Sequence, residues 1–416
     1  MSLTASAGTS TASGHLLDED GAIATAIDAG HTLPSSWYTD DQVFRLEQQL
    51  IFRRQWEFVG HLGQVSAPGD FFAYDASGVP IVVVRDHDGI VRAFVNICRH
   101  RHNPVAIGAG NKRMLMCRYH AWTYKLDGTL NKAPRSNEDP DFDGTELSLT
   151  PLPIDFLGDM IFVNPSGDAP PLAEVLGPIP EIARHKGIPL DRATFRESRT
   201  MEFEANWKLP WDNNVECYHC PTVHKTWYQQ ARLDPEHVYS FPIGPFHFQH
   251  VVDQRENAVT DNHFYCWPAF CLTTDSSTGA DFDRRTGHLH PTTDQTASAE
   301  PAPALPGYFM WKFVPLSASR TRMEWHMFTV EAADPQALNE IFEGLLSVVR
   351  EDQEICEGVQ RSHQSGAGQL GTLIPAIDSE FTTLTWEKLV HRALTRPEVP
   401  LYAPLLEPSP TWPDRT

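Results

Sequence analysis

Two short segments in the first third of the chain carry cysteine and histidine at a spacing that suits a metal centre. Cys98 and His100 are separated by one residue; after sixteen intervening residues, Cys117 and His120 are separated by two. Two thiolates and two imidazoles can hold a tetrahedral zinc ion. They can also hold a [2Fe–2S] cluster in which two histidines replace two cysteines on one iron and raise its potential.

The order of these ligands along the chain favours the cluster. A zinc finger usually pairs Cys with Cys and His with His, whereas here each segment contributes one of each. A binuclear cluster needs this order, because each segment then gives a thiolate to one iron and an imidazole to the other. His102 is a rival ligand, but its spacing from Cys98 fits less well. We therefore expect Cys98, His100, Cys117 and His120 to bind [2Fe–2S].

A second set of candidate ligands suits a single iron ion. Non-haem Fe(II) that activates dioxygen takes two histidines and one carboxylate and keeps its other positions open. His219 and His224 offer the imidazoles. We expect a helix over residues 206–219, which Pro221 ends or kinks because proline cannot continue a helix interior. The carboxylate must come from another part of the chain.

Asp352 is the best candidate for that carboxylate. A long helix is expected there, and its apolar residues form one stripe: Leu338, Ile341, Phe342, Leu345, Val348, Val349, Ile355 and Val359. Asp352 falls in the middle of the stripe. The neighbouring glutamates are expected to point away from it: Glu351, Glu354 and Glu357. A buried carboxylate is costly unless it is paired or coordinates a metal, so we expect Asp352 to be the third iron ligand.

The remaining cysteines suggest free thiols. The chain has seven cysteines, an odd number, and in a chain of this length that indicates ligands and free thiols in a reducing compartment, not a disulfide framework. Cys217 and Cys220 form a C-x-x-C that could be a redox pair or half of a zinc site. No second half-site follows, so neither reading is favoured.

The elements that must position these residues follow from local patterns. We expect a helix over 39–56, capped by Asp40, and then short β-runs over 58–129 with hairpin turns at Asp88-Gly89 and Asp127-Gly128. Further strands are expected at 160–163, 196–203, 246–252, 264–273, 309–314 and 322–330. The long helix should open at Asp334 and Pro335. Residues 275–306, rich in Ser, Thr, Pro and Asp, are expected to form a surface loop.

Composition excludes several classes of partner. The chain of 416 residues has 33 basic and 54 acidic residues and a formal charge of −21, which argues against nucleic acid and anionic membranes. No apolar run approaches the roughly 18 residues that span a bilayer. Residues 1–14 lack the basic and apolar regions of a secretory signal and are expected to be a disordered tail. These features predict a soluble, cytoplasmic enzyme.

The ligand motifs together resemble the alpha subunits of Rieske-type non-haem iron oxygenases, the ring-hydroxylating and N-demethylating enzymes. The resemblance covers roughly residues 40 to 395 and is carried by these segments: Cys98-Arg-His100-Arg, Cys117-Arg-Tyr-His120-Ala-Trp-Thr-Tyr, Asn206-Trp207-Lys208, Glu216-Cys-Tyr-His219-Cys-Pro with His224, and Glu351-Asp352 followed by Cys356-Glu357 and Val359-Gln360-Arg361. The family often has Gly where His102 stands; we expect this difference to alter the packing beside the cluster and to leave the four ligands in place.

The resemblance implies an α+β architecture with an all-β Rieske [2Fe–2S] domain and a helix-grip (START-like) catalytic domain. We assign residues 1–36 to the tail, 57–160 to the Rieske domain, and 37–56 with 161–416 to the catalytic domain. It also implies one [2Fe–2S] cluster and one Fe(II) per chain, held in a homotrimer. The cluster of one subunit would serve the iron of its neighbour through a carboxylate three residues before the first iron histidine, here Glu216. Physically, such a residue would hydrogen-bond the outer nitrogen of His219.

Electrons must come from another protein. The chain has neither a G-x-G-x-x-G fingerprint after a strand nor the spacing of a plant-type ferredoxin. We expect a separate NAD(P)H-dependent reductase or ferredoxin as partner.

The substrate is the least determined feature. Glutamate at position 216 resembles the group that acts on choline, glycine betaine, carnitine and stachydrine, which predicts monooxygenation of an N-methyl or N-alkyl carbon in a charged amine. Some tryptophans could cage the cation, although most are expected in the core: Trp207, Trp211, Trp227, Trp267 and Trp325. One alternative is hydroxylation or dihydroxylation of an aromatic acid or a natural-product intermediate. Another is a non-catalytic iron–sulfur electron carrier or sensor.

Overall fold

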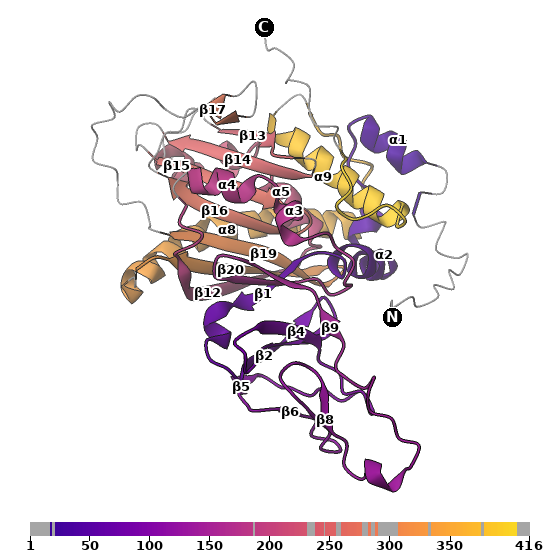
Figure 1. Cartoon of the computed structure of the whole chain (residues 1–416). Coiled ribbons are helices and arrows are strands. Elements are labelled where there is room, and N and C mark those ends of the chain that lie inside the picture. The colour runs from indigo at the N-terminus through magenta and orange to yellow at the C-terminus, as the bar shows by residue number, and fades with distance from the viewer. Residues whose placement is uncertain are drawn as a thin grey trace.

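The computed structural model describes most of the chain: residues 17–18, 21–185, 188–230, 238–244, 246–254, 259–276, 282–283, 288–289, 307–331, 334–375 and 378–405. Within these residues the chain forms two units stacked end on end, a smaller β unit and a larger α+β unit (Figure 1). None of the helices in this part of the chain has the length and apolar character needed to cross a bilayer.

The smaller unit is built from two antiparallel sheets. One has the order β5-β2-β3-β4-β9 and the other the order β6-β7-β8. Their strands are β2 (Asp70–Ala76), β3 (Val79–Arg85), β4 (Val91–Val95), β5 (Ala109–Asn111), β6 (Leu115–Met116), β7 (Thr123–Tyr124), β8 (Leu130–Lys132) and β9 (Pro151–Leu152). The expected Asp-Gly turns are present, with positive φ at Gly89 and Gly128. A Cβ atom on Gly128 would clash with the ring of Phe94, so that turn requires glycine.

The larger unit is organised around a seven-stranded antiparallel sheet of order β12-β20-β19-β16-β15-β14-β13. Its strands are β12 (Thr194–Phe203), β13 (Val238–Pro242), β14 (His247–Gln254), β15 (Val259–Cys266), β16 (Phe270–Ser276), β19 (Gly307–Ser317) and β20 (Arg320–Thr329); a short hairpin joins β17 (Phe282–Asp283) to β18 (His288–Leu289). The helices are α3 (Leu172–Leu176), α4 (Ile179–His185), α5 (Lys208–Asn214), α6 (Cys220–Val223), α7 (Lys225–Gln230), α8 (Pro335–Gln364) and α9 (Asp378–Thr395).

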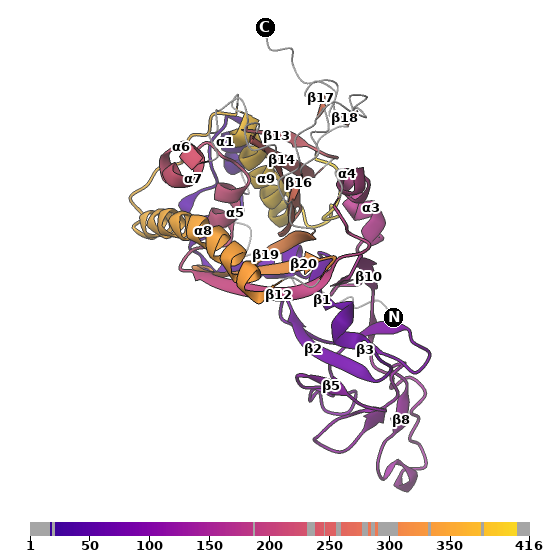
Figure 2. The same ribbon diagram turned by 90° about the vertical axis from the view of Figure 1, so that its left-hand side faces the viewer.

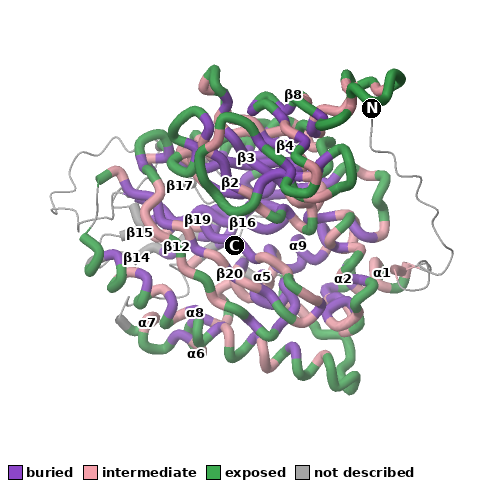
Figure 3. The backbone as a smooth tube through the Cα atoms, turned by 90° about the horizontal axis from the view of Figure 1, so that it is seen from below, coloured by how far each residue is buried: buried purple, intermediate pink, exposed green. Residues whose placement is uncertain are grey.

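The sheet curves around α5, α8 and α9 (Figure 2). The indole of Trp386 on α9 contacts the aromatic rings of Trp211, Phe248 and Trp267, so α9 closes the core of this unit. Buried residues gather along strands such as β2, β3 and β16, while the outer turns are exposed (Figure 3). This is the grip of a sheet on a helix that the family resemblance implied.

A small sheet of order β1-β11-β10 connects the two units, formed by β1 (Glu57–His61), β10 (Ile154–Leu157) and β11 (Met160–Val163). The buried Lys312 of β19 also bridges them. Its ammonium group donates hydrogen bonds to the carbonyl oxygen of Phe58 at 2.8 Å and to the hydroxyl of Tyr74 at 2.7 Å. A buried charge is costly without hydrogen-bond partners, so the ammonium group of Lys312 must keep these two contacts. They hold the β unit against the large sheet.

The N-terminal tail is shorter than expected. Residues 1–16 lie outside the described part, but the expectation of disorder through residue 36 is wrong. Helix α1 (Ala22–Asp28) is followed by a 3-10 turn, η2 (Ser35–Tyr38), and Ile27 and Leu33 are buried in the core of the large unit. These two apolar residues supply the packing surface that residues 1–14 lack.

Three other expectations need correction. Helix α2 (Asp41–Glu47) is capped by Asp40 as expected, but it continues only as a π-helical turn, η3 (Gln48–Phe52), and ends before 56. The single strand expected at 264–273 is a hairpin, because the chain turns at residues 267–269 between β15 and β16. The loop expected over 275–306 begins inside β16, and most of it lies outside the described residues.

One fully buried ion pair fixes the end of α2 to the start of α5. The ammonium of Lys208 contacts the carboxylate of Glu47, with side-chain exposures of 1% and 0%. The indole N–H of Trp207 donates to the same carboxylate at 2.8 Å. Breaking a buried pair by removing one partner is costly, because the other charge is left without compensation.

We expect Lys208→Met to lower the free energy of unfolding by about 3–5 kcal/mol, because it strands the carboxylate of Glu47 in the core. Urea unfolding followed by tryptophan fluorescence measures the loss. The double variant Glu47→Gln/Lys208→Met removes both charges and should recover most of it. If the double variant is as unstable as the single one, lost packing and not the uncompensated charge is the cause.

Candidate metal centres and substrate cavity

The segment Asn206-Trp207-Lys208 anchors the part of the chain that carries the candidate iron ligands. The backbone N–H of Asn206 donates to the side-chain oxygen of Gln360 on α8 at 2.9 Å, and its amide nitrogen donates to the carbonyl oxygen of Ala318 at 2.8 Å. With the Lys208–Glu47 pair, these bonds tie the start of α5 to three other elements. The start of the ligand segment is therefore held in a fixed position relative to α8, the helix that carries Asp352.

The ligand segment is not the continuous helix expected from residue 206. Helix α5 ends at Asn214, and the single-turn helix α6 (Cys220–Val223) follows after a break. His219 stands at the N-terminal boundary of α6 and His224 at its C-terminal boundary. Pro221 lies in the first turn of α6, where a missing N–H costs nothing. It therefore starts a helix instead of ending one, which corrects the expectation.

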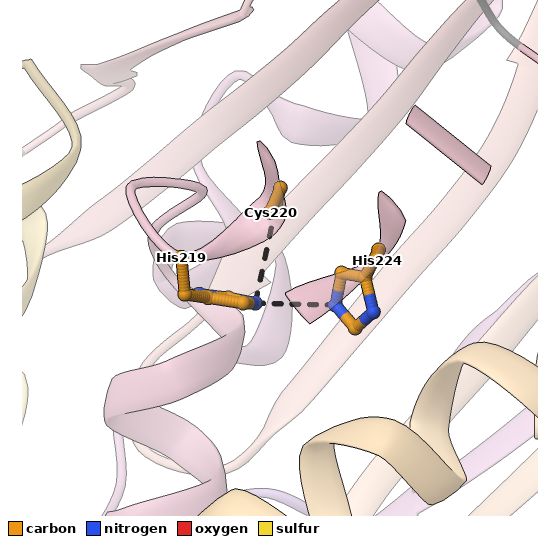
Figure 4. Close-up of side chains that lie close together, drawn as sticks. All are labelled: His219, Cys220 and His224. Atoms are coloured by element: carbon orange, nitrogen blue, oxygen red, sulfur yellow. Dashed lines mark hydrogen bonds between the residues drawn. The ribbon is translucent and has the colours of Figure 1, made fainter. Parts of the chain in front are cut away.

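The structure brings His219, His224 and Asp352 together. The Nε2 atoms of the two histidines lie 3.2 Å apart (Figure 4). The Oδ1 atom of Asp352 lies 3.0 Å from Nε2 of His224 and 3.4 Å from Nε2 of His219. Ligands bound to one metal at about 2.0–2.2 Å are separated by about 3 Å. The three atoms thus surround one point at the spacing that a metal ion requires.

The chemistry of the donor set also fits a metal. Oδ1 of Asp352 is buried and has no hydrogen-bond partner among the described residues, although a buried carboxylate oxygen normally has one. Two imidazoles and one carboxylate with open positions are the set that non-haem Fe(II) takes in oxygenases. Burial alone would lower the pKa of His219, but Asp352 and Glu216 raise it to about 9.

Each histidine is held from behind by a glutamate. The carboxylate of Glu216 contacts Nδ1 of His219, and that of Glu351 contacts Nδ1 of His224 at 2.8 Å. A carboxylate only accepts, so each Nδ1 carries a hydrogen, and each Nε2 would offer its lone pair to a metal that replaces the proton at the shared point. This contact was predicted for Glu216 but not for Glu351. Glu351 is exposed, away from the buried face of its helix as expected, yet its carboxylate reaches His224.

Helix α8 buries a face that differs in part from the expected stripe. Asp352 is on the buried face, 5% exposed, but Ile355 and Val359 are 43% and 39% exposed. The buried positions are Leu338, Phe342, Leu346, Val349, Asp352, Cys356 and Gln360. Beyond Asp352, the helical repeat of 3.6 residues places Cys356 and Gln360 on the buried face. The predicted stripe, which was based on apolar residues alone, did not include them.

A cavity of about 300 Å³ opens onto the three candidate ligands. Its aromatic lining comes from Trp227, Tyr265, Phe309, Trp311 and Trp325. Trp311 and Trp325 are direct cross-strand partners on β19 and β20. Of the five tryptophans considered from the sequence, two line the cavity and three are fully buried core residues: Trp207, Trp211 and Trp267. Trp311 was missed, because no local pattern shows which strand faces the site.

The polar lining combines carboxylates with neutral histidines. Glu216, Asp261 and Asp352 contribute carboxyl groups. Burial lowers the pKa of His250 to about 3, helped by the neighbouring His263, and burial lowers that of His263 to about 4. Both imidazoles are therefore uncharged at neutral pH. The side chains named here give the cavity a negative electrostatic character.

The four candidate cluster ligands lie on two adjacent loops of the small unit. Cys98 and Cys117 are buried, and their thiols adjoin. The rings of His100 and His120 lie 4.6 Å apart between centroids. The two thiols therefore lie together, and so do the two imidazoles. A cluster with two thiolates on one iron and two imidazoles on the other needs this arrangement. The buried Nδ1 of His120 has no hydrogen-bond partner in the described structure, which fits an atom that binds a metal.

Polar groups around the sulfurs suit thiolate ligands. The hydroxyl of Tyr124 lies 3.3 Å from Sγ of Cys98, and the amide of Asn103 donates to Sγ of Cys117 at 3.7 Å. Burial raises the pKa of the Cys117 thiol, but backbone N–H groups of Tyr119 and His120 outweigh burial and lower it. The pocket therefore stabilises negative charge on sulfur.

The backbone of His102 closes the turn that carries Cys98. Its N–H donates to the carbonyl oxygen of Cys98 at 3.0 Å, and Ala121 makes the equivalent bond to Cys117 at 3.1 Å. His102 and Ala121 both have positive φ, 61° and 56°. A left-handed residue closes each loop, which explains why the resembling family often has glycine there. The imidazole of His102 is exposed, on the surface of the loop.

Comparison with known families agrees with this architecture. Residues 55–151 match the model of the Rieske [2Fe–2S] domain, and residues 190–300 match that of the ring hydroxylating alpha subunit catalytic domain. The chain therefore contains a Rieske [2Fe–2S] domain followed by a ring-hydroxylating catalytic domain.

Several relatives of this Rieske-type chain act on quaternary amines according to their names. It is 32% identical over 208 residues to the carnitine monooxygenase oxygenase subunit of Acinetobacter pittii, covering 50% of this chain and 56% of the relative. It is 35% identical over 196 residues to the glycine betaine monooxygenase oxygenase subunit of Chromohalobacter salexigens, covering 47% and 43%. The matched segments thus span about half the length of these relatives.

Solved structures show the same fold over most of the chain. A quaternary ammonium Rieske monooxygenase in complex with L-carnitine superposes with a TM-score of 0.72 and 24% identity, covering 87% of this chain and 95% of that one. Naphthalene 1,2-dioxygenase from Rhodococcus sp. bound to indole superposes with a TM-score of 0.68 and 19% identity, covering 90% and 97%. The predicted fold class, an all-β Rieske domain with a catalytic α+β domain, is confirmed.

We expect Asp352→Asn to lose the mononuclear iron and turnover while keeping the visible spectrum of the cluster, because an amide is a far poorer ligand for Fe(II) than a carboxylate. Iron analysis and the visible spectrum of the purified variant check this. Glu354→Gln, an exposed acid on the same helix, is the matched control and should keep both metals. Full iron and activity in Asp352→Asn would assign the third ligand to another acid.

Proposed function

We propose that this chain is the terminal oxygenase component of a system that hydroxylates an N-methyl or N-alkyl carbon of a cationic amine with O₂. The observation that carries this proposal is the cavity that opens onto His219, His224 and Asp352 and is lined by the indoles of Trp227, Trp311 and Trp325. The relatives named as carnitine and glycine betaine monooxygenases support it. Hydroxylation of an N-methyl carbon gives a carbinolamine that collapses to amine and formaldehyde.

The chain's own residues have distinct roles in this reaction. Trp311 and Trp325 line the cavity and would attract a quaternary or protonated amine through their indole rings. His219, His224 and Asp352 would hold Fe(II), which activates O₂ when it is bound. The Nδ1–H groups of the two histidines stay protonated against Glu216 and Glu351, so both rings keep one orientation while substrate enters.

Electrons would reach the iron from a neighbouring subunit. Within one chain, β5 and β8 of the small unit, each of which follows a cluster loop in the sequence, lie far from α6 of the large unit (Figure 2). A homotrimer that places the cluster of one subunit beside the iron site of the next removes this separation. Glu216 is suited to the junction, because it contacts His219 and its side chain is 13% exposed. A separate NAD(P)H-dependent reductase or ferredoxin would reduce the cluster.

The alternatives fit the cavity less well. None of the residues described as lining the cavity is a lysine or an arginine, so the carboxylate of an aromatic acid would have no such side chain to pair with there. A pure electron carrier would have no use for two histidines and an aspartate converging at 3.0 to 3.4 Å below an aromatic cavity. Iron content separates the classes, with about three atoms per chain for the oxygenase and about two for a carrier.

A substrate panel tests the proposed reaction. The chain with a surrogate reductase should consume NADH and O₂ with choline, glycine betaine, carnitine or proline betaine and release formaldehyde or another aldehyde. Benzoates and salicylates should give no coupled uptake. Trp325→Leu should raise KM for the active amine about 2- to 30-fold, the equivalent of the roughly 0.5–2 kcal/mol of a cation–π contact, with the cluster spectrum unchanged. Coupled turnover of aromatic acids alone would overturn the substrate assignment.

Paired glutamate variants test the electron route. Glu216→Gln and Glu351→Gln each neutralise the carboxylate behind one histidine, so each should weaken metal binding, by up to about 10- to 100-fold. At saturating Fe(II), Glu351→Gln should regain NADH-coupled turnover, whereas Glu216→Gln should not, because only Glu216 lies on the proposed path between subunits. Equal recovery of both variants would remove Glu216 from that path.

A further inference from the structure

The structure contains a disulfide directly beside the candidate iron ligands. Cys217 and Cys220 are bonded to each other, with their Cα atoms 5.0 Å apart. The expectation that these cysteines are free thiols is therefore wrong for this pair. Both residues line the substrate cavity, and Cys217 is only partly buried. A small reductant or oxidant that enters the cavity can thus reach the bond.

The sulfur of Cys220 lies close to the two histidines of the candidate metal site. Its Sγ atom is 3.9 Å from Nε2 of His219 (Figure 4), and Nε2 of His219 is 3.2 Å from Nε2 of His224. One atom of each of these three residues falls within 4.8 Å of the others. Two ligands bound at about 2.0 and 2.3 Å to a tetrahedral metal are about 3.5 Å apart. Asp352 is not part of this group of three, so the Cys220 side chain must turn toward the shared point, once the disulfide opens, to complete that geometry.

We propose that Cys220 is a redox-controlled fourth ligand of the mononuclear metal site. In the disulfide, its sulfur is bonded to Cys217 and offers no thiolate. A dithiol reduces the bond by exchange, giving two thiols on this chain and one disulfide on the reductant. Cys220 then binds the metal as a thiolate and releases its proton. This inference rests on the metal-binding part of the proposed function.

The two states would differ in what the metal site can do. With the disulfide formed, two imidazoles and one carboxylate leave open positions for O₂, as an oxygenase requires. With Cys220 bound, the site becomes a closed set of two nitrogens, one sulfur and one oxygen. Soft thiolate ligation and tetrahedral closure favour zinc over iron. Hydrogen peroxide would restore the open state, because two thiols and one peroxide give one disulfide and two waters.

The bond also spans the residues that orient the site. Cys217 follows Glu216 directly, and Cys220 follows His219 directly. The loop closed by the disulfide therefore contains His219, while Glu216 is adjacent to it. Opening the disulfide frees the sulfur of Cys220 beside the contact between His219 and Glu216. The redox state of the disulfide and the ligands of the metal are therefore linked through residues that are adjacent in the chain.

The test reads the metal's ligands directly. The mononuclear iron of the holoenzyme is replaced with Co²⁺, and X-ray absorption is recorded at the cobalt edge, where the iron–sulfur cluster does not contribute. A phosphine, which adds no sulfur, reduces the disulfide: phosphine, disulfide and water give phosphine oxide and two thiols. Cys217→Ser and Cys220→Ser are matched variants, because both abolish the disulfide but only the first leaves a thiol beside His219.

We expect a sulfur neighbour at about 2.3 Å in the reduced wild type and in Cys217→Ser, and none in the oxidised wild type or in Cys220→Ser. Absence of sulfur from the reduced wild type would overturn the proposal, as would sulfur in Cys220→Ser. If Cys217→Ser does not fold, the comparison of oxidised and reduced wild type decides alone. The measurement needs no substrate, so its failure is distinguishable from a failure of amine oxidation.

Discussion

The convergence of three lone pairs on one point is the constraint on which the rest of the large unit depends. Nε2 of His219, Nε2 of His224 and Oδ1 of Asp352 lie within 3.0 to 3.4 Å of one another. Such an arrangement is unfavourable unless a cation occupies the point or the surroundings hold it in place. Glu216 and Glu351 supply part of that hold, since each takes the Nδ1 hydrogen of one histidine and so directs Nε2 inward.

The surroundings that hold the site are distributed over the whole unit. The ligand histidines and Asp352 come from segments more than a hundred residues apart, and Asn206 joins them by bonding Gln360 two turns beyond Asp352 on α8. The buried pair of Lys208 and Glu47 adds a third attachment. A buried ion pair contributes little net stability because of its desolvation, but its directional bonds define where α5 starts. The pair therefore fixes the position of α5 more than it stabilises the folded chain.

The same sheet that supports the ligands also defines what enters the cavity. Trp311 and Trp325 lie opposite each other on β19 and β20, and His250 and His263 face the cavity from the neighbouring strands β14 and β15. Burial keeps these imidazoles neutral, so the acidic groups are not offset by them. Aromatic faces and carboxylates together favour a cation. The chemistry at the metal and the selection of the substrate thus both depend on the seven-stranded sheet.

The amino-acid sequence by itself determined the candidate ligands, because the signals are local. Alternating Cys and His identify the loops of Cys98 and Cys117, and an acid within an apolar stripe singles out Asp352. The β-runs and Asp-Gly turns of the small unit likewise follow from neighbours in the chain.

Only the tertiary structure decided the features that depend on contacts between distant segments. Glu351 contacts His224 because α8 lies beside α6, and Trp311 lines the cavity because β19 pairs with β20. The packing of Ile27 in the core of the large unit has the same origin. Helical periodicity tells which face of an element is buried, but not which partner meets it. That choice is made by long-range packing, for which a single sequence carries no local signal.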